Sequence, residues 1–207
     1  MSLHFKNITY SNNRGDLIFN NFNLQVENLD KIGIYGKRGS GKTTLANFIT
    51  DEINNYKGKI ILNGDILENY ENYFKKIKIL FQNPEIQFVF PIIKDEYDFI
   101  INNKFYEKIS DRIFKTASFF KFNIKSFMET ENTIYSVSFS ELKLIQIIFT
   151  LSKPCEYLIL DEPFMLLGEE DSNNLIKYLN LIDDKAMLIL SKKLQTLERV
   201  AEKIIKI

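Results

Sequence analysis

The sequence predicts an α/β fold: a parallel sheet with helices, preceded by an antiparallel β part and interrupted by a helical insert. Three observations predict it. An apolar strand at 31–35 leads into a glycine-rich loop, after which apolar residues recur at helical spacing. Residues 157–160 are apolar without alternation, as in a strand in the middle of a parallel sheet. Residues 85–135 contain no convincing strand and are rich in aromatic residues at helical spacing.

The loop at 36–44 fits the phosphate-binding pattern G-x-x-x-x-G-K-[ST]. Its glycines allow backbone N–H groups to surround phosphates, and the helix that follows adds a partial positive charge. Lys42 is expected to reach the β- and γ-phosphates, and the Thr43 hydroxyl is expected to bind Mg²⁺. A glycine-rich turn is the alternative, but the flanking strand and helix favour nucleotide binding. The predicted nucleotide-binding residues are Gly36, Gly39, Ser40, Gly41, Lys42, Thr43 and Thr44.

Two stretches before this loop, 3–11 and 22–27, alternate apolar and polar residues and predict half-buried antiparallel strands. Turn-forming residues at 11–16 connect them. Tyr10 lies at the end of the first strand and is a candidate for stacking on adenine. An ordinary cross-strand aromatic residue is the equally weighted alternative.

After the first helix, strands are predicted at 59–62 and 77–81, and Pro84 then stops regular structure. Gln82 lies at the C-terminal edge of the second of these strands, where open α/β sheets collect ligands. Gln82 is therefore a candidate to contact Mg²⁺ or the attacking water, with the start of a loop as the alternative. In the insert, most aromatic rings are expected to fill a core, and some to form a docking face.

Ser138 and Glu141 have the spacing of a capping box, which predicts that an apolar helix at 142–151 begins there. The rest of the chain predicts a strand at 157–160 and then two further helices and strands, at 169–182, 186–191, 194–201 and 203–207.

The strand at 157–160 ends in two acids, Asp161 and Glu162. In a parallel sheet this end lies beside the phosphate loop, so that Asp161 suits Mg²⁺ coordination and Glu162 suits a general base for water. Two acids at a strand end often form only a solvated turn. A phosphate loop in the same chain favours the catalytic interpretation.

Composition limits the class of protein. The chain has 27 Lys and Arg against 27 Asp and Glu, which predicts no nucleic-acid partner. Its one cysteine excludes an internal disulfide, and no signal pattern or run long enough to span a bilayer is present. We therefore expect one soluble cytoplasmic domain that reaches a membrane only through partners.

The order of these motifs resembles the ATP-binding subunits of ABC transporters. Within that family, Phe81-Gln82-Asn83-Pro84-Glu85-Ile86-Gln87-Phe88, followed by Asp95-Glu96 and Phe99, looks like the energy-coupling-factor (ECF) ATPases, which drive uptake of vitamins and of cobalt or nickel. The resemblance implies a P-loop NTPase of ABC type: a single domain over 1–207, with a RecA-like core at 1–84 and 136–207 and a helical subdomain at 85–135.

The resemblance also implies roles for single residues. Tyr10 takes the adenine-stacking position, and Gln82 takes the Q-loop position that contacts Mg²⁺ and water. Asp161 binds Mg²⁺, and Glu162 is the catalytic base. Ser138 contacts the nucleotide of the opposite subunit in a head-to-tail dimer.

Partners follow from the same resemblance. They are a second ATPase subunit, an integral membrane coupling subunit whose basic helices dock near Asp95 and Glu96, and a membrane subunit that binds the substrate. The chain would lie peripherally on the inner face of the cell membrane and hydrolyse ATP with Mg²⁺.

Three segments depart from the family pattern. The signature reads Val137-Ser138-Phe139-Ser140-Glu141, without its two glycines. The D-loop has Gly168 in place of an aspartate, and Lys192 stands in place of the switch histidine. We therefore expect a weak ATPase when the chain is alone and activity beside a different ATPase subunit. A regulatory nucleotide-binding subunit with little hydrolysis is the alternative.

Overall fold

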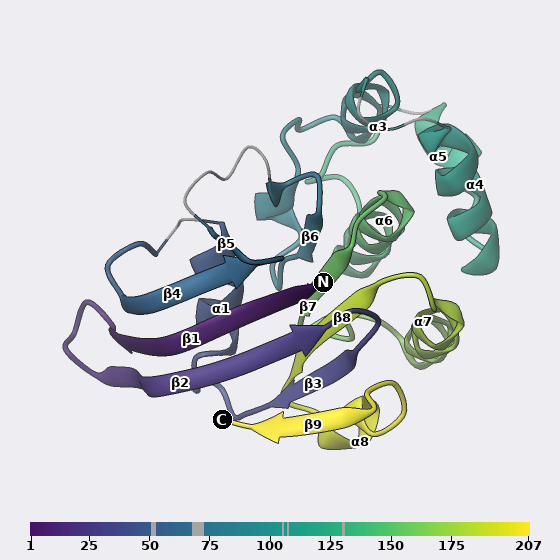
Figure 1. Cartoon of the computed structure of the whole chain (residues 1–207). Helices are drawn as coiled ribbons and strands as arrows, with labels where there is room; N and C mark the ends of the chain where they lie inside the picture. The colour runs from purple at the N-terminus through teal and green to yellow at the C-terminus, as the bar shows by residue number, and fades with distance from the viewer. Residues whose placement is uncertain (51–52, 68–72, 105, 107, 130) are drawn as a thin grey trace. The chain divides into compact units, whose positions relative to one another are not determined.

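The computed structural model describes residues 1–50, 53–67, 73–104, 106, 108–129 and 131–207. Its backbone packs into two compact units (Figure 1). The first unit contains 1–79, 155–162 and 183–207, and the second contains 80–154 and 163–182. The second unit extends beyond the predicted helical part at 85–135, because two later helices also pack there.

An antiparallel sheet of the first unit has the strand order β2-β1-β4-β5. Its strands are β1 (Ser2–Ser11), β2 (Leu17–Glu27), β4 (Lys57–Leu62) and β5 (Asp65–Ile66). β2 begins at Leu17 rather than at the predicted residue 22. Two asparagines at 20–21 interrupt its alternation without ending it: the pairing register shifts there, and Asn21 adopts a left-handed φ of 52°.

The second sheet of this unit has the order β6-β7-β8-β3-β9, with parallel pairing of β7 to β8, β8 to β3 and β3 to β9. Its strands are β3 (Lys31–Tyr35), β6 (Ile77–Leu80), β7 (Tyr157–Asp161), β8 (Ala186–Ser191) and β9 (Lys203–Lys206). Every residue of β7 and β8 is buried. The prediction of a central parallel strand at 157–160 is therefore confirmed.

Helix α1 (Lys42–Ile49) packs against strands of both sheets, and its apolar side chains belong to the main core of the unit. The Phe48 ring lies 5.4 Å from that of Tyr10 on β1. The helix ends at Ile49, because the backbone of Thr50 leaves the helical region with ψ near 1°. Helix α8 (Leu194–Leu197) is shorter than the predicted 194–201, since turns follow it.

The second unit is built from helices. They are α3 (Ile93–Ile101), α4 (Ile109–Phe119), α5 (Ile124–Met128), α6 (Phe139–Ser152) and α7 (Glu169–Leu181), with a short 3₁₀ turn η1 (Glu85–Gln87). Helices α3 to α5 confirm the predicted helical character of 85–135. Within its described residues, strand-like pairing is limited to a bridge between Ile92 and Thr133.

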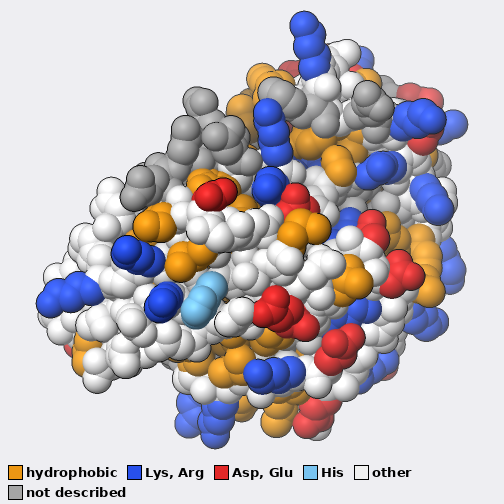
Figure 2. Space-filling view, viewed as in Figure 1, with side chains coloured by type: hydrophobic (Ala, Val, Ile, Leu, Met, Phe, Trp, Pro, Cys, Tyr) orange, Lys and Arg blue, Asp and Glu red, His pale blue; other side chains and the backbone are white. Residues whose placement is uncertain are grey.

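Surface charge is mixed. Basic and acidic side chains intermingle over the face shown in Figure 2, in keeping with the 27 basic and 27 acidic residues of the chain. Among the described helices, none has the length and hydropathy needed to cross a bilayer.

Candidate active site

The phosphate loop connects the end of β3 to the start of α1. Gly41 is the N-cap of α1 with φ 97°, a left-handed value that favours glycine. A Cβ on Gly41 would lie 2.8 Å from Phe19 Cζ, so a side chain there would collide with β2. A Cβ on Gly36 would lie 2.2 Å from Ser40 Oγ. Close packing therefore favours glycine at both positions.

Three further loop residues complete the predicted set. Gly39 lies at the exposed tip of the loop, and Thr44 is half-buried in α1. The Ser40 hydroxyl is buried and has no hydrogen-bond partner within the described part of the chain. A buried hydroxyl of this kind is satisfied when an oxygen atom, such as that of a phosphate, comes within reach.

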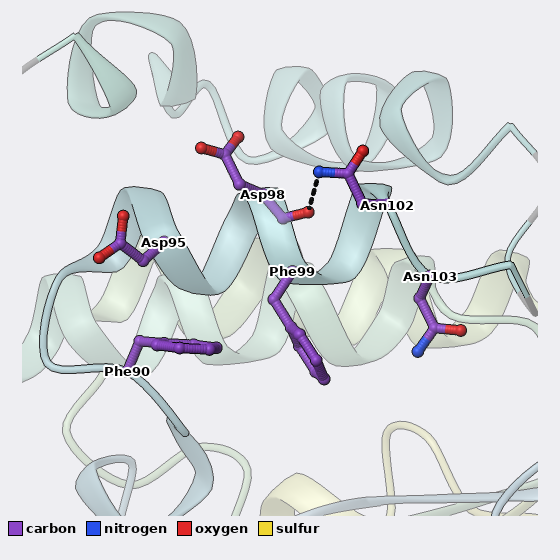
Figure 3. Close-up of a pocket in the computed structure, with 6 residues that line it drawn as sticks. All are labelled: Phe90, Asp95, Asp98, Phe99, Asn102 and Asn103. Atoms are coloured by element: carbon purple, nitrogen blue, oxygen red, sulfur yellow. Dashed lines mark hydrogen bonds between the residues drawn. The ribbon is translucent and has the colours of Figure 1, made fainter.

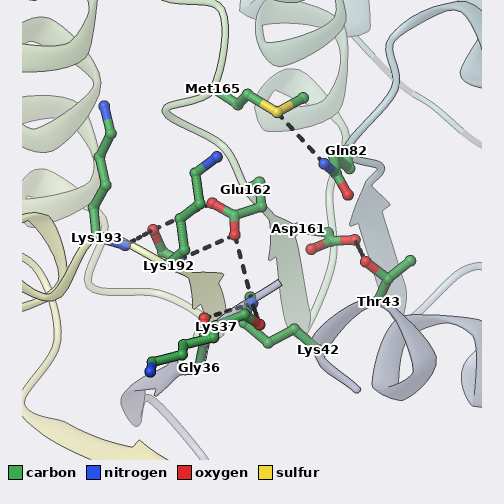
Figure 4. A network of polar contacts seen from close by, with 11 residues as sticks. Gly36, Lys37, Lys42, Thr43, Gln82, Asp161, Glu162, Met165, Lys192 and Lys193 are labelled. Atoms are coloured by element: carbon green, nitrogen blue, oxygen red, sulfur yellow. Dashed lines mark hydrogen bonds and ion pairs between the residues drawn. The ribbon is translucent and has the colours of Figure 1, made fainter. Parts of the chain in front are cut away.

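Lys42 is folded back onto its own loop (Figure 4). Its Nζ donates to Gly36 O at 2.7 Å and to Lys37 O at 2.9 Å, and lies 3.7 Å from Glu162 Oε1. The side chain is only 6% exposed. The ammonium group thus stands inside the loop and is paired with a carboxylate.

Thr43 and Asp161 meet although they are 118 residues apart in the sequence. The Thr43 hydroxyl donates to Asp161 Oδ2 at 2.6 Å, because β7 delivers Asp161 to the start of α1. Asp161 is fully buried at the last position of β7. A hydroxyl oxygen beside a carboxylate is a hard-ligand pair that fits Mg²⁺.

Glu162 is held in an unusual conformation directly after β7. Its φ is 45°, in the left-handed region that costs a non-glycine residue about 1–2 kcal/mol. Its N–H donates to Leu190 O at 2.9 Å. Its carboxylate accepts from the Lys192 N–H at 3.0 Å and from the Ser191 hydroxyl at 3.4 Å. The carboxylate is therefore fixed toward Lys42 by the end of β8.

Ser191 and the Lys192 N–H are partners of Glu162 that were not predicted from the sequence. The signal lies in the strand order: Asp161 pairs with Leu190 in the parallel ladder, so the residues that follow each strand must also meet. Lys192 contacts Glu162 through its backbone, and its side chain is exposed.

Tyr10 is buried in the core of the first unit, with 8% of its surface exposed. Its ring meets Phe48 edge-on, at an interplanar angle of 88°. This packing favours the cross-strand alternative over adenine stacking, because the ring is already enclosed by β1 neighbours and α1.

Gln82 and Ser138 belong to the second unit. Gln82 follows the end of β6, and its Nε2 donates to Met165 Sδ at 3.4 Å (Figure 4). Ser138 is the N-cap of α6 and forms the predicted capping box with Glu141. The Ser138 hydroxyl also donates to Glu141 Oε2 at 2.6 Å, and this bond holds the pKa of the Glu141 carboxyl below its usual value.

Replacing Ser138 by alanine should lower the free energy of unfolding by about 1 kcal/mol, because an orphan N–H of α6 loses its acceptor. Urea denaturation at pH 7 measures this. Ser118→Ala on α4 is the matched control, since Ser118 is exposed and its hydroxyl donates back to Phe114 O within its own helix. Equal losses in the two variants would contradict the cap. Glu141 also contributes to the free energy of unfolding, because its pKa is lowered on folding. This contribution is present at neutral pH and is lost as the pH falls through the lowered pKa.

Comparison with known proteins agrees with this geometry. The family described as ABC transporter matches residues 19–165. The chain is 30% identical over 188 residues to the energy-coupling factor transporter ATP-binding protein EcfA1 of Mesomycoplasma hyopneumoniae, which covers 88% of this chain and 68% of that protein. It is 33% identical over 91 residues to the biotin transport ATP-binding protein BioM of Rhodobacter capsulatus, covering 44% of this chain and 38% of BioM.

A solved structure described as an ATP binding subunit of an ABC transporter matches the whole chain and 86% of its own length with a TM-score of 0.84. At 16% identity this likeness concerns the fold. The family match covers most of the chain and includes the phosphate loop, Asp161 and Glu162. The chain therefore belongs to the ABC transporter family, as an ATP-binding ATPase subunit similar to the energy-coupling-factor ATP-binding proteins.

Proposed function

We propose that this chain hydrolyses MgATP to drive an uptake transporter of the energy-coupling-factor type, whose cargo is a vitamin or a transition metal ion. The observation that supports it most is the polar network of the first unit, in which Thr43 bonds Asp161 and Lys42 pairs with Glu162. EcfA1 and BioM, the latter a biotin transport protein by name, support the transport role and the class of cargo.

Each residue of the network has a separate task. Lys42 exchanges the loop carbonyls and Glu162 for the phosphates of ATP, and the Ser40 hydroxyl adds a donor. The oxygens of Thr43 and Asp161 would hold Mg²⁺, which supplies charge neutralisation to the phosphates. Glu162, released from Lys42, orients water and takes its proton. Gln82 is the further proposed contact to Mg²⁺ or to this water.

In the signature segment of this chain, the Glu141 carboxylate accepts hydrogen bonds from Ser138. Glu141 Oε2 accepts from the Ser138 N–H at 3.0 Å and from its hydroxyl, and Ser140 Oγ lies 3.1 Å from Ser138 Oγ. A negative charge at the N-terminus of α6 cancels the partial positive charge that would attract a γ-phosphate. We infer that this chain completes a partner's ATP site poorly and works beside a different ATPase subunit with an intact signature.

The isolated chain should therefore be a weak ATPase whose rate rises when the partner subunit is added. In the complex, the triple change Phe139→Gly, Ser140→Gly and Glu141→Gln should raise the rate further, since it restores backbone access and removes the competing charge. Phosphate release assays on the chain alone, on the complex and on the variant complex measure this. Full activity of the purified chain alone, as a symmetric dimer, would refute the heterodimer.

The proposed dock for a membrane coupling subunit is a hollow on the second unit with a volume of about 360 Å³ (Figure 3). It is lined by Phe90, Asp95, Asp98, Phe99, Asn102 and Asn103. The rings of Phe90 and Phe99 lie 5.5 Å apart, and Phe99 is 50% exposed. An exposed ring and a half-buried ring beside two carboxylates suit a helix that presents both apolar and basic side chains.

Glu96 does not belong to this surface, contrary to the expectation from sequence. It is 5% exposed, and its Oε2 accepts from the N–H groups of Val89 and Phe90 at 2.8 and 3.2 Å. Glu96 thus shapes the loop that carries Phe90, while Asp95 and Asp98 supply the charge of the hollow.

The transporter role is tested by capture of the tagged chain from native membranes. We expect a second ATPase subunit and two integral membrane proteins to be recovered with it, which would place the chain on the cytoplasmic face of the membrane. The Asp95→Lys and Asp98→Lys double variant should lose the membrane proteins while it keeps the ATPase partner. Recovery without any membrane protein would contradict the transporter role and leave the ATPase assignment intact.

A further inference from the structure

A polar stripe runs along α6, a helix whose other buried side chains are nearly all apolar. Lys143, Gln146 and Thr150 are spaced by three and four residues and so share one face. Their exposures are 0%, 1% and 1%. Burying an ammonium group is costly unless carbonyls or carboxylates surround it. The stripe therefore must have a polar counterpart.

That counterpart is the segment that carries Gln82. Lys143 Nζ donates to Phe81 O at 2.8 Å and to Gln82 O at 3.2 Å. Gln146 Nε2 donates to Phe81 O at 3.1 Å and to Gln87 Oε1 at 2.6 Å. All of these residues belong to the second unit.

Gln87 closes the network from the other side. Its Oε1 accepts from the Phe81 N–H at 3.0 Å, and its Nε2 donates to Thr150 Oγ1 at 2.9 Å. Because β6 ends at Leu80, side chains satisfy both backbone groups of Phe81 just beyond the strand. The backbone immediately before Gln82 is thus fixed to α6 and to Gln87.

An ammonium group is well suited to this position. It has three N–H donors, so one side chain can donate to two converging carbonyls, whereas an apolar residue would take this donor from Gln82 O and leave Phe81 O with Gln146 Nε2. Lys143 is the fifth residue after Ser138, the N-cap of the same helix, which corresponds to a rise of about 7.5 Å along a rigid helix. The polar stripe and Ser138, at the N-terminus of α6, therefore lie on one rigid helix.

We propose that Lys143 is a positioning residue for ATP hydrolysis: it clamps the Gln82 backbone to α6, so that Gln82 and Ser138 move as one body. Displacement of the signature end by a partner subunit is thereby transmitted to Gln82. The inference rests on the proposed role of Gln82 at the Mg²⁺ or water position.

A double-mutant cycle in the complex purified through the tagged chain tests this. Gln82→Ala and Lys143→Met should each lower kcat about tenfold or more, and the double variant should be no slower than Gln82→Ala within about twofold. Binding of MgATP should change less than about twofold, since Lys42 and Thr43 lie in the first unit. Lys143→Gln, which retains a donor, should recover part of kcat. Lys121→Met, which removes an exposed ion pair with Glu170, is the matched control.

The outcomes separate the two proposals. The role of Lys143 would be refuted, with that of Gln82 unaffected, by either of two results. One is a loss of kcat in the double variant that equals the product of the two single losses. The other is a kcat of Lys143→Met that equals the kcat of Lys121→Met. An unchanged kcat in Gln82→Ala would overturn the role of Gln82 and the clamp together, and would leave nucleotide binding by Lys42 unaffected. If Lys143→Met does not fold, Gln146→Leu replaces it in the cycle with the same expectations, because it removes another donor to Phe81 O.

Discussion

Glu162→Gln should lower kcat for ATP hydrolysis in the assembled complex by at least about a hundredfold, with nucleotide affinity retained or raised. The amide keeps the shape of the side chain and can still accept from the Lys192 N–H, but it has no basicity toward water. It also removes the ion pair with Lys42, so that the Glu162 side chain no longer competes as an anion with the phosphates for Lys42. Steady-state phosphate release and titration calorimetry with MgATP measure the two effects.

The matched control is Glu156→Gln at the opposite end of β7. Glu156 accepts from Asn63 at 2.9 Å and pairs with Lys76 at 3.8 Å, away from the phosphate loop. The Glu156→Gln complex should retain the kcat of the unaltered complex. A normal rate in Glu162→Gln would show that Glu162 is not the base, and the alternative of a regulatory nucleotide-binding subunit would gain.

Lys42→Ala should weaken MgATP binding by at least tenfold, about 1.4 kcal/mol. A charge-assisted contact to the phosphates is lost. The same change leaves the Glu162 carboxylate buried without its ammonium partner and removes one donor from each of two loop carbonyls, so the free energy of unfolding should also fall.

Lys59→Ala, on the exposed face of β4, controls for loss of a lysine and should alter neither quantity. Lys42→Met keeps the buried apolar stem and separates the affinity loss from the stability loss. Calorimetry that finds unchanged MgATP affinity in both Lys42 variants would contradict the assignment of the phosphate loop.

The parallel sheet and the phosphate loop were predictable because their signals are local. A run of apolar residues such as 157–160 and the loop at 36–44 each specify their own structure within a few residues. The capping box of Ser138 is local in the same way, and it is confirmed. The position of Asp161 and Glu162 beside the phosphate loop was predictable because the C-terminal ends of parallel strands lie at the same edge of the sheet.

Contacts that depend on strand order or on side-chain direction were not predictable. Ser191 reaches Glu162 across 29 residues only because β8 is the neighbour of β7. Lys143 and Gln146 interrupt an otherwise apolar helix, and periodicity does not say that their face is buried against polar backbone. Tyr10 could point to solvent or to the core, and the packing of Phe48 decided this.

The left-handed backbone at Glu162 affects how the sequence at this position is expected to evolve. Glycine at this position would relieve the strain, and it would remove a carboxylate from a buried site. A duplicated copy that only bound nucleotide would therefore gain stability by substitution here and should drift toward glycine or asparagine. If Glu162 is the base, an acid retained at this strained position would distinguish copies that hydrolyse ATP, and sequences alone would show it.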